Sequence, residues 1–220
     1  MTELVVGTRP SALARRQTEQ VIAQLRAAWP DLNCRVVTLT TEGDRLGEQP
    51  LPQIGGKGLF TQAIEAALRS GEIALAVHSL KDLPTAGADD LIIGAVTERA
   101  DPRDVLISRH GLPLQQLPPG ARVGTSSLRR AAQVRALRPD VEIVPLRGNV
   151  DTRLRKAARP DMDAVILAAA GVIRLGRADE VTQWLPLDLV LPAPGQGALA
   201  VQVRADDAAL LRRLAAIHHR

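Results

Sequence analysis

One segment of this chain, residues 73–84 (IALAVHSLKDLP), constrains the fold most. Its apolar run of about five residues is too short for a buried helix and long enough for a buried strand. His78, Ser79, Lys81 and Asp82 follow directly, and a proline then ends the element. Polar groups therefore gather at the carboxyl end of a strand, the edge at which open α/β sheets bind ligands. Taken alone, Asp82 is more simply interpreted as a helix cap or a solvated loop carboxylate.

The same order of strand, polar turn and helix recurs along the chain, which indicates an α/β fold. At the first such turn, Arg9 and Ser11 combine a guanidinium with the N–H groups of a starting helix, a combination that can hold an anion. Strands are expected at residues 4–8, 34–40, 91–96, 105–108, 122–125, 141–146, 164–168 and 198–204. Helices are expected at residues 11–28, 59–69, from 126 or 127 to 137, and 206–218, the last capped by Asp206.

The sequence GTSS, between a strand and a helix, is the clearest anion-site signature. Ser126 and Ser127 bring two hydroxyls to the first N–H groups of the helix, where the helix dipole favours negative charge. Arg129 and Arg130 follow within that first turn, and basic residues there are unfavourable unless an anion is present. A pair of solvated arginines is the alternative interpretation.

Two further strands present arginine at the same predicted sheet edge. The strand ending near residue 146 delivers Arg147, Asn149 and a helix that carries Arg153, and the strand at residues 164–168 leads to Gly171 and Arg174. Arginine pairs in a two-pronged manner with carboxylate and phosphate groups. Three strand ends with arginine therefore predict one ligand that bears several carboxylates or phosphates.

Composition limits the number of domains and the kinds of site that the chain can form. The chain has 220 residues, of which 45% are hydrophobic, enough for one large or two small domains. No run approaches the length of about 18 apolar residues that crosses a bilayer, and the N-terminus lacks a signal-peptide pattern, so a cytoplasmic protein is expected. Cys34 is the only cysteine and is predicted to be a structural thiol. No metal site is expected, because neighbouring His218 and His219 do not share a helix face.

The basic sequence pI of about 10.1 raises nucleic-acid binding as a possible function. Aromatic residues are only 1% of the chain, so the side chains on which bases stack are scarce. Residues 55–58 (GGKG) do not form a P-loop, because the Lys is followed by Gly rather than by Ser or Thr. The polar segment 41–50 is predicted to be a mobile loop. A compact polyanion fits these features better than a nucleic acid, but the residues alone do not choose between a binding protein and an enzyme.

Several motifs together resemble one enzyme family. They are VGTRPSALARRQ, GGKGLFTQAIEAAL, AVHSLKDLP, RADPRD, GTSSLRRAAQ, LRGNVDTRL, LAAAGVIRLG and LPAPGQGALAVQVR. In this order, from Val5 to about His219, they resemble the porphobilinogen deaminase (hydroxymethylbilane synthase) family of tetrapyrrole biosynthesis. The resemblance implies two periplasmic-binding-protein-like (type II) α/β domains with a cleft between them. Residues 1–97 plus 197–217 would form the first domain, and residues 103–191 the second.

The resemblance also implies an activity and roles for individual residues. The family joins four porphobilinogen molecules head to tail into hydroxymethylbilane and releases ammonia at each addition. Asp82 matches the catalytic aspartate, which would stabilise the cation left by deamination. Residues matching positions that hold cofactor and substrate are Arg9, Ser11, Lys81, Thr125, Ser126, Ser127, Arg129, Arg130, Arg147, Asn149, Arg153, Gly171 and Arg174. Lesser roles are implied for further residues in matched motifs, which are Gln17, Asp44, Lys57, Phe60 and Gln196.

The family carries a dipyrromethane cofactor, so this cofactor is expected here too. In the family it is attached by a thioether to a cysteine of a third, small domain with a GGC-type motif, and Cys34 lies outside any such motif. The resemblance further implies a monomer that acts on a small molecule and binds neither nucleic acid nor membrane. The alternative function is a non-catalytic fragment that binds pyrroles or other polycarboxylates.

Overall fold

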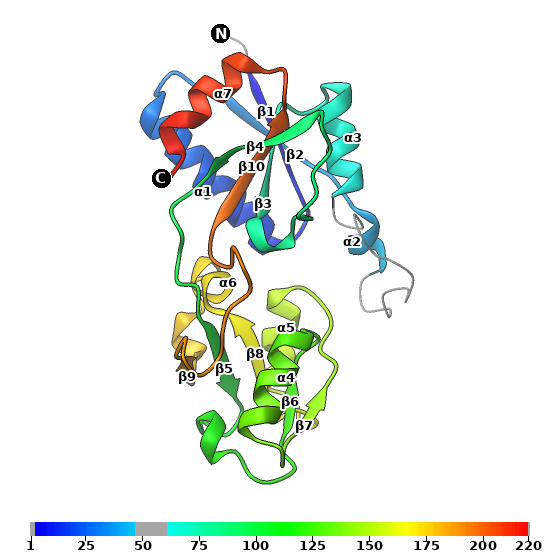
Figure 1. Ribbon diagram of the computed structural model, residues 1–220, viewed down its shortest axis with the longest axis vertical. Helices are drawn as coiled ribbons and strands as arrows, with labels where there is room; N and C mark the ends of the chain where they lie inside the picture. The colour runs from blue at the N-terminus through cyan, green and yellow to red at the C-terminus, as the bar shows by residue number, and fades with distance from the viewer. Residues whose placement is uncertain (1–2, 47–60, 220) are drawn as a thin grey trace. The chain divides into compact units, whose positions relative to one another are not determined.

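The computed structural model describes residues 3–46 and 61–219, which fall into two compact units. Unit 1 comprises Met1–Arg99 with Ala198–Arg220, and unit 2 comprises Ala100–Gly197. Each unit contains a five-stranded sheet with helices packed against it (Figure 1). The chain leaves unit 1 after residue 99 and returns to it at residue 198, so unit 1 is built from two separate segments.

In unit 1 the returning segment supplies an interior strand of the sheet. The strands are β1 (Leu4–Thr8), β2 (Cys34–Thr38), β3 (Leu75–Ser79), β4 (Leu91–Val96) and β10 (Leu199–Arg204), in the order β2-β1-β3-β10-β4. β2 and β3 both run parallel to β1, whereas β10 runs antiparallel to both β3 and β4. The helices are α1 (Ala12–Ala28), α2 (Glu42–Leu46), α3 (Gln62–Ser70) and α7 (Ala208–Leu214), with short 3-10 helices η1 (Leu80–Asp82) and η4 (Ala215–Ile217).

Alternate residues of these strands pack into two apolar layers. Val77 of β3 and Val201 of β10 share a core with Leu25 of α1 and Leu210 of α7. On the opposite face, Ala76 of β3 packs with buried residues of α3. Burial of apolar side chains on both faces is the main stabilising contribution to such a sheet.

Unit 2 has a similar arrangement. Its strands are β5 (Asp104–Ser108), β6 (Arg122–Gly124), β7 (Glu142–Val144), β8 (Ala164–Ala168) and β9 (Gln183–Leu185), in the order β7-β6-β8-β5-β9. β6, β7 and β8 are parallel, and β5 pairs antiparallel with β8 and β9. The helices are α4 (Leu128–Leu137), α5 (Val150–Ala157) and α6 (Ala169–Arg174), with η2 (Leu114–Gln116) and η3 (Ala178–Glu180). Within the described ranges, no helix is long and apolar enough to span a bilayer.

Several predicted elements have the observed bounds. The strands at residues 4–8, 91–96 and 164–168 are confirmed, and the helix predicted from Ser11 begins at Ala12 with Ser11 as its N-cap. The strand β9, the helix α6 and the short 3-10 helices were not predicted. The segment predicted as a polar loop, residues 41–50, contains the short helix α2 in its described part.

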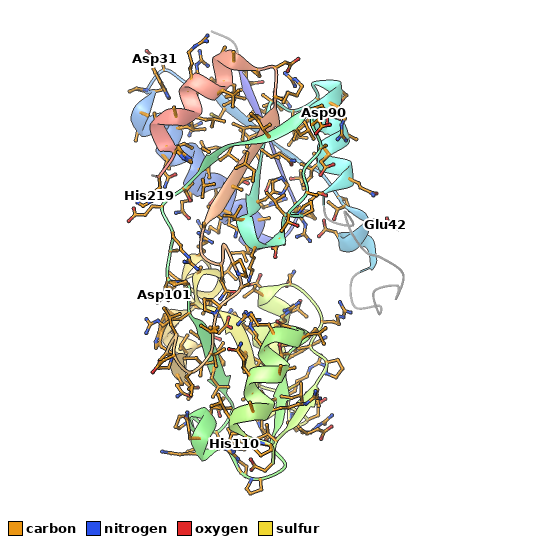
Figure 2. All side chains as sticks on the ribbon, viewed as in Figure 1. Asp31, Glu42, Asp90, Asp101, His110 and His219 are labelled. Atoms are coloured by element: carbon orange, nitrogen blue, oxygen red, sulfur yellow. The ribbon has the colours of Figure 1, made fainter. Side chains whose placement is uncertain are left out.

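The C-terminal helix differs most from its prediction. Asp207 rather than Asp206 caps it, because the Oδ1 atom of Asp207 accepts a hydrogen bond of 3.0 Å from the Leu210 N–H. The helix and η4 end at Ile217, and His218 is extended. The Nδ1 atom of His218 accepts from the Val96 N–H, and the N–H of His219 (Figure 2) donates to the Val96 carbonyl. Pairing with the edge strand β4 thus replaces the last helical turn.

We expect the core of unit 2 to depend strongly on Leu106, which is fully buried on β5. A Leu106→Ala substitution removes apolar contacts and leaves a cavity, which costs about 2–5 kcal/mol of folding free energy. Leu128→Ala, on a side chain that is 87% exposed, is the matched control and should cost less than about 0.5 kcal/mol. Chemical denaturation of both variants measures the difference, and equal effects would contradict this assignment of the core.

Candidate functional site

A small pocket lies at the carboxyl ends of β1 and β3 in unit 1. Its lining consists of Arg9, Ala14, Gln17, Thr61, Val77, His78, Ser79 and Asp82. β1 and β3 are parallel, so the turns that follow them emerge at the same edge of the sheet. The fold thereby brings together Arg9, Gln17 and Asp82, which the sequence analysis had singled out.

Asp82 lies in η1, directly after β3, and its side chain is exposed. Among the residues that the structure describes, no donor makes a hydrogen bond or ion pair to its carboxylate. Lys81, its neighbour in η1, is half-buried. The oxygens of Asp82 are therefore available to N–H groups or to positive charge on a ligand.

Arg9 is held by an acid from the same unit. Its Nε and Nη2 atoms lie 3.2 and 2.5 Å from the Oδ2 and Oδ1 atoms of Asp44, and Oδ2 also accepts from the N–H and hydroxyl of Thr41. Partial burial raises the pKa of Asp44, but the hydrogen bonds from Arg9 and Thr41 outweigh it and hold that pKa below its ordinary value. Asp44 therefore orients Arg9 at the pocket.

Two further predicted residues connect α1 with the sheet edge. The hydroxyl of Ser11 caps α1 by accepting from the Ala14 N–H at 3.2 Å. Gln17 is buried one turn further on, and its amide donates to the Ser79 hydroxyl at 2.9 Å. These contacts fix the first turns of α1 against the end of β3.

His78 is a buried imidazole in the pocket lining, and the sequence analysis gave it no role. Its residue exposure is 8%, and its Nε2 atom has no hydrogen-bond partner in the described part of the chain. Burial lowers the pKa of His78 to about 4, and the nearby positive charge of Arg9 acts in the same direction. His78 is therefore neutral at physiological pH.

In unit 2, the parallel strands β6, β7 and β8 bring three polar turns to one sheet edge. After β6, the Thr125 hydroxyl accepts from the Ser127 N–H, and the Ser126 hydroxyl donates to the Leu146 carbonyl at 2.8 Å. Ser127 is the N-cap of α4, and its hydroxyl accepts from the N–H of Arg130. All three hydroxyls thus organise the turn that starts α4.

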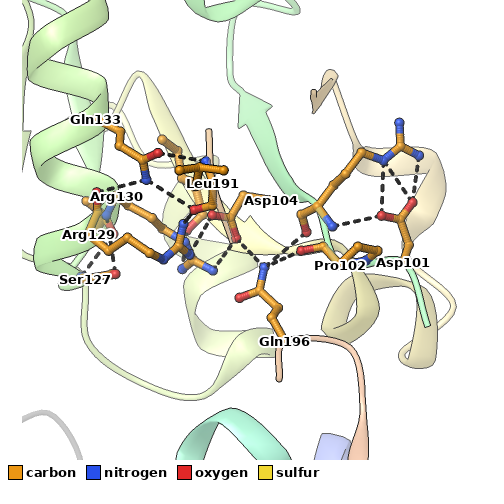
Figure 3. A network of polar contacts seen from close by, with 12 residues as sticks. Asp101, Pro102, Asp104, Ser127, Arg129, Arg130, Gln133, Leu191 and Gln196 are labelled. Carbon is orange, nitrogen blue, oxygen red and sulfur yellow. Dashed lines mark hydrogen bonds and ion pairs between the residues drawn. The ribbon is translucent and has the colours of Figure 1, made fainter. Parts of the chain in front are cut away.

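The arginines of α4 meet an acid that the sequence analysis missed (Figure 3). Asp104 is fully buried at the start of β5 and accepts hydrogen bonds of 2.7 Å from the Nη2 atoms of both Arg129 and Arg130. Burial raises the pKa of Asp104, but the two guanidinium groups and Gln196 more than offset it, so that pKa is lowered. Asp104 thus supplies one negative charge beside the two arginines of this helix turn. Because Arg130 is buried, the alternative of two solvated arginines is wrong.

The turns after β7 and β8 hold the remaining predicted arginines. Arg147 is half-buried, and no described residue accepts a hydrogen bond from its guanidinium. Asn149 caps α5 through a 2.9 Å bond from the Thr152 N–H, and Arg153 donates to the carbonyl of Gly148, a glycine whose φ of 107° favours this residue type. Arg174, at the end of α6, donates to the Gly197 carbonyl at 2.7 Å.

The other predicted residues occupy different settings. Gln196 is buried and donates to the Pro102 carbonyl at 2.8 Å and to Asp104 at 2.9 Å. Gly171 is buried within α6. Lys57 and Phe60 lie outside the described residues. Across residues 3–46 and 61–219, no cluster of three or more His, Cys, Asp or Glu side chains could hold a metal ion.

Two other features of unit 1 are less suited to reacting with or binding a ligand. Cys34 is half-buried against the core, and burial raises the pKa of its thiol, which disfavours the reactive thiolate. A larger hollow of about 340 Å³ surrounds Arg69, Asp90 and Arg204 (Asp90 is labelled in Figure 2). Its charges are already paired, as in the 2.7 Å contact of Arg69 with Asp90, so it has no unbalanced charge for a ligand.

The comparison with known proteins agrees with the resemblance seen in the motifs. The family model described as "Porphobilinogen deaminase, dipyromethane cofactor binding domain" matches residues 4–212. This chain belongs to the porphobilinogen deaminase family. The porphobilinogen deaminase of Moorella thermoacetica is 52% identical over 219 residues, which cover 100% of this chain and 70% of that protein. That of Shouchella clausii is 51% identical over 220 residues, with coverage of 100% and 71%.

Solved structures extend the likeness of the porphobilinogen deaminase fold to distant proteins. The methionine-binding protein MetQ is 14% identical, with a TM-score of 0.59 over 98% of this chain and 89% of that one. The Bordetella pertussis BvgS VFT2 domain is also 14% identical, with a TM-score of 0.56 over 98% and 86%. At this identity the likeness concerns the fold, and it confirms the predicted periplasmic-binding-protein-like (type II) architecture.

A dipyrromethane is compatible with the residues of unit 2. The family model names this cofactor, whose acidic side chains need cationic and N–H donors. The edge formed by β6, β7 and β8 offers both, since α4 and α5 begin there with capped N-termini beside Arg129 and Arg147. The donor set therefore fits a ligand that bears several carboxylates.

The neutral imidazole of His78 should make folding sensitive to mild acid. Its folded-state pKa of about 4 lies below the unfolded value of about 6.5, so the unfolded chain binds the extra proton first. The contribution of the neutral His78 to the free energy of unfolding should be fully present above about pH 6.5. It should be lost as the pH is lowered towards 4, by up to about 3 kcal/mol.

Denaturant unfolding between pH 7 and pH 4.5 measures this loss. His78→Gln should remove this contribution to the pH dependence, whereas His219→Gln, on an exposed histidine, should retain it. The same slope in His78→Gln as in the unmodified chain would rule out His78 as its source.

Proposed function

We propose that this chain carries out the reaction of its family, the stepwise condensation of four porphobilinogen molecules into hydroxymethylbilane with release of ammonia. The observation that carries this proposal is the exposed carboxylate of Asp82, which no described residue engages, in the pocket with Arg9 and Gln17. Family membership supports the transferase, and no finding favours the alternative of a non-catalytic binding fragment.

Asp82 supplies the negative charge that each condensation needs. The carbon–nitrogen bond of the protonated aminomethyl group breaks, ammonia leaves with the bonding electron pair, and the positive charge passes to the pyrrole. A new carbon–carbon bond then forms to the unsubstituted pyrrole carbon of the partner, and that carbon loses its proton. A fixed carboxylate beside the pyrrole stabilises this charge and accepts the pyrrole N–H, an effect worth about 10²–10³ in rate for a single group.

The cationic side chains and the residues that cap the helix N-termini bind the substrate. Each porphobilinogen bears an acetate and a propionate, which pair with guanidinium groups in two-pronged contacts. Arg147 is the best placed in unit 2, because no described acid neutralises it. The other proposed groups are Arg9, Ser11, Lys81, Thr125, Ser126, Ser127, Arg129, Arg130, Asn149, Arg153, Gly171 and Arg174, with lesser roles for Gln17, Asp44, Lys57, Phe60 and Gln196.

The dipyrromethane, when bound, supplies the starting end to which the first substrate unit is added. Arg129, Arg147 and the N-termini of α4 and α5 would hold its carboxylates. Cys34 is not assigned as its attachment point, because the thiol is half-buried on β2 and its pKa is raised. We further propose that units 1 and 2 are the family's first two domains, and that the chain acts as a cytoplasmic monomer without nucleic acid or membrane.

We expect Asp82→Asn to lower the rate of porphobilinogen consumption by about 10²-fold or more while leaving substrate binding largely intact. Asp89→Asn is the matched control, because Asp89 is an exposed aspartate in the loop that follows η1. Ammonia release and substrate loss measure turnover, and calorimetry measures binding. Turnover of Asp82→Asn within a few-fold of the unmodified chain would contradict the role of Asp82. Binding without any ammonia release by the unmodified chain would contradict the transferase function.

A further inference from the structure

The carboxylate of Asp104 joins three side chains from two separate parts of unit 2 (Figure 3). Its Oδ2 atom accepts from Arg129, and its Oδ1 atom accepts from Arg130 and from the Gln196 amide at 2.9 Å. The carboxylate is fully buried, so each of these bonds acts where competition from water is small. Asp104 therefore connects the first turn of α4 with Gln196, near the point where the chain leaves unit 2.

The two arginines around Asp104 are not equivalent. Arg130 has a side-chain exposure of 6%, and its Nη1 atom donates to the Ile166 carbonyl of β8, so it is part of the core. Arg129 has a side-chain exposure of 24%, and its second contact is the Leu191 carbonyl. If Arg129 leaves, Asp104 and Arg130 remain as a balanced pair. If Arg130 left, a buried charge would lose its main partner, which is far more costly.

Leu191 is attached to α4 through its backbone. Its carbonyl accepts from Arg129 and from the Gln133 amide at 3.2 Å, and its N–H donates to the Gln133 Oε1 atom at 2.7 Å. At the other end of the same segment, Gln196 is held by Asp104 and the Pro102 carbonyl. The segment 191–196 is thus fixed to α4 at Leu191, and to Pro102 and Asp104 at Gln196.

This segment leads directly to the part of unit 1 that carries Asp82. Residue 198 follows Gly197 along the chain, and the Ala198 carbonyl accepts a 3.1 Å bond from the N–H of Leu80, the first residue of η1. A change in segment 191–196 therefore has a short covalent and hydrogen-bonded path to η1.

We propose that Arg129 is an exchangeable link, positioned by Asp104, that transmits binding of a carboxylate ligand to the segment 191–196. This inference rests on the proposed function, in which Arg129 pairs with an acidic side chain of the substrate. When a ligand carboxylate pairs with the Arg129 guanidinium, the hydrogen bonds from Arg129 to the Leu191 carbonyl and to Asp104 break. Arg130 remains paired with Asp104 and balances its charge. The segment is then held at Leu191 by Gln133 alone, and its backbone opens more readily.

Hydrogen exchange of the segment tests this link, with porphobilinogen as the probe. In the unmodified chain, ligand should speed exchange in peptides that cover residues 191–196 by about five- to tenfold, as expected for the loss of one charge-assisted hydrogen bond. Arg129→Gln should show this faster exchange without ligand and little further change with it. Arg135→Gln, an exposed arginine on the same helix, is the matched control and should behave like the unmodified chain.

Asp104→Asn is less suitable as the test, because it leaves Arg130 buried without a negative partner and endangers folding. Binding of porphobilinogen, measured by calorimetry under the same conditions, separates the two hypotheses. Heat of binding with unchanged exchange at residues 191–196 would overturn the link and leave the proposed function standing. Unchanged exchange in Arg129→Gln would also overturn it. Absence of any binding would contradict the proposed function and this inference together.

Discussion

Parallel strands can be joined only by connections that cross back over the sheet, and this constraint governs both units. Each connection begins where a strand ends, so the turn after β3 in unit 1 and the turns after β6, β7 and β8 in unit 2 face the carboxyl edge of their sheets. At those turns the chain places Asp82, the Ser127 cap and the Asn149 cap. The topology therefore determines where polar groups gather in each unit before any ligand is considered.

Internal acids decide which of these polar groups a ligand can use. Asp44 holds Arg9, and Asp104 holds Arg129 and Arg130, so these guanidinium groups are oriented in the absence of a ligand. Groups fixed in advance lose little freedom on binding and need little reorganisation during a reaction. Asp82 and Arg147 differ from them, because no described residue neutralises either. Among the strand-end turns that the structure describes, Asp82 in unit 1 and Arg147 in unit 2 thus have no partner of opposite charge.

Local sequence patterns predicted much of the fold and some of the candidate site. Short apolar runs identified β1, β4 and β8, and the helix starts near Ser11 and Ser127 could be recognised because the capping partners lie only three residues away. Asp104 could not be recognised in this way. Its partners are 25, 26 and 92 residues distant, and an acid at the start of an apolar strand gives no signal of them. For a similar reason β9 escaped prediction, since three residues that pair with the distant β5 show no periodicity of their own.

The sequence by itself determined the class of the units, the polar residues that follow each strand, and membership of the porphobilinogen deaminase family. These properties depend on short-range periodicity and on motifs that survive as contiguous residues. Only the tertiary structure decided that β10 lies between β3 and β4, and that Asp104 pairs with both Arg129 and Arg130 while no described acid pairs with Arg147. The physical reason is that strand order and charge pairing join residues far apart in the chain, and the packing of the whole unit fixes which of them meet.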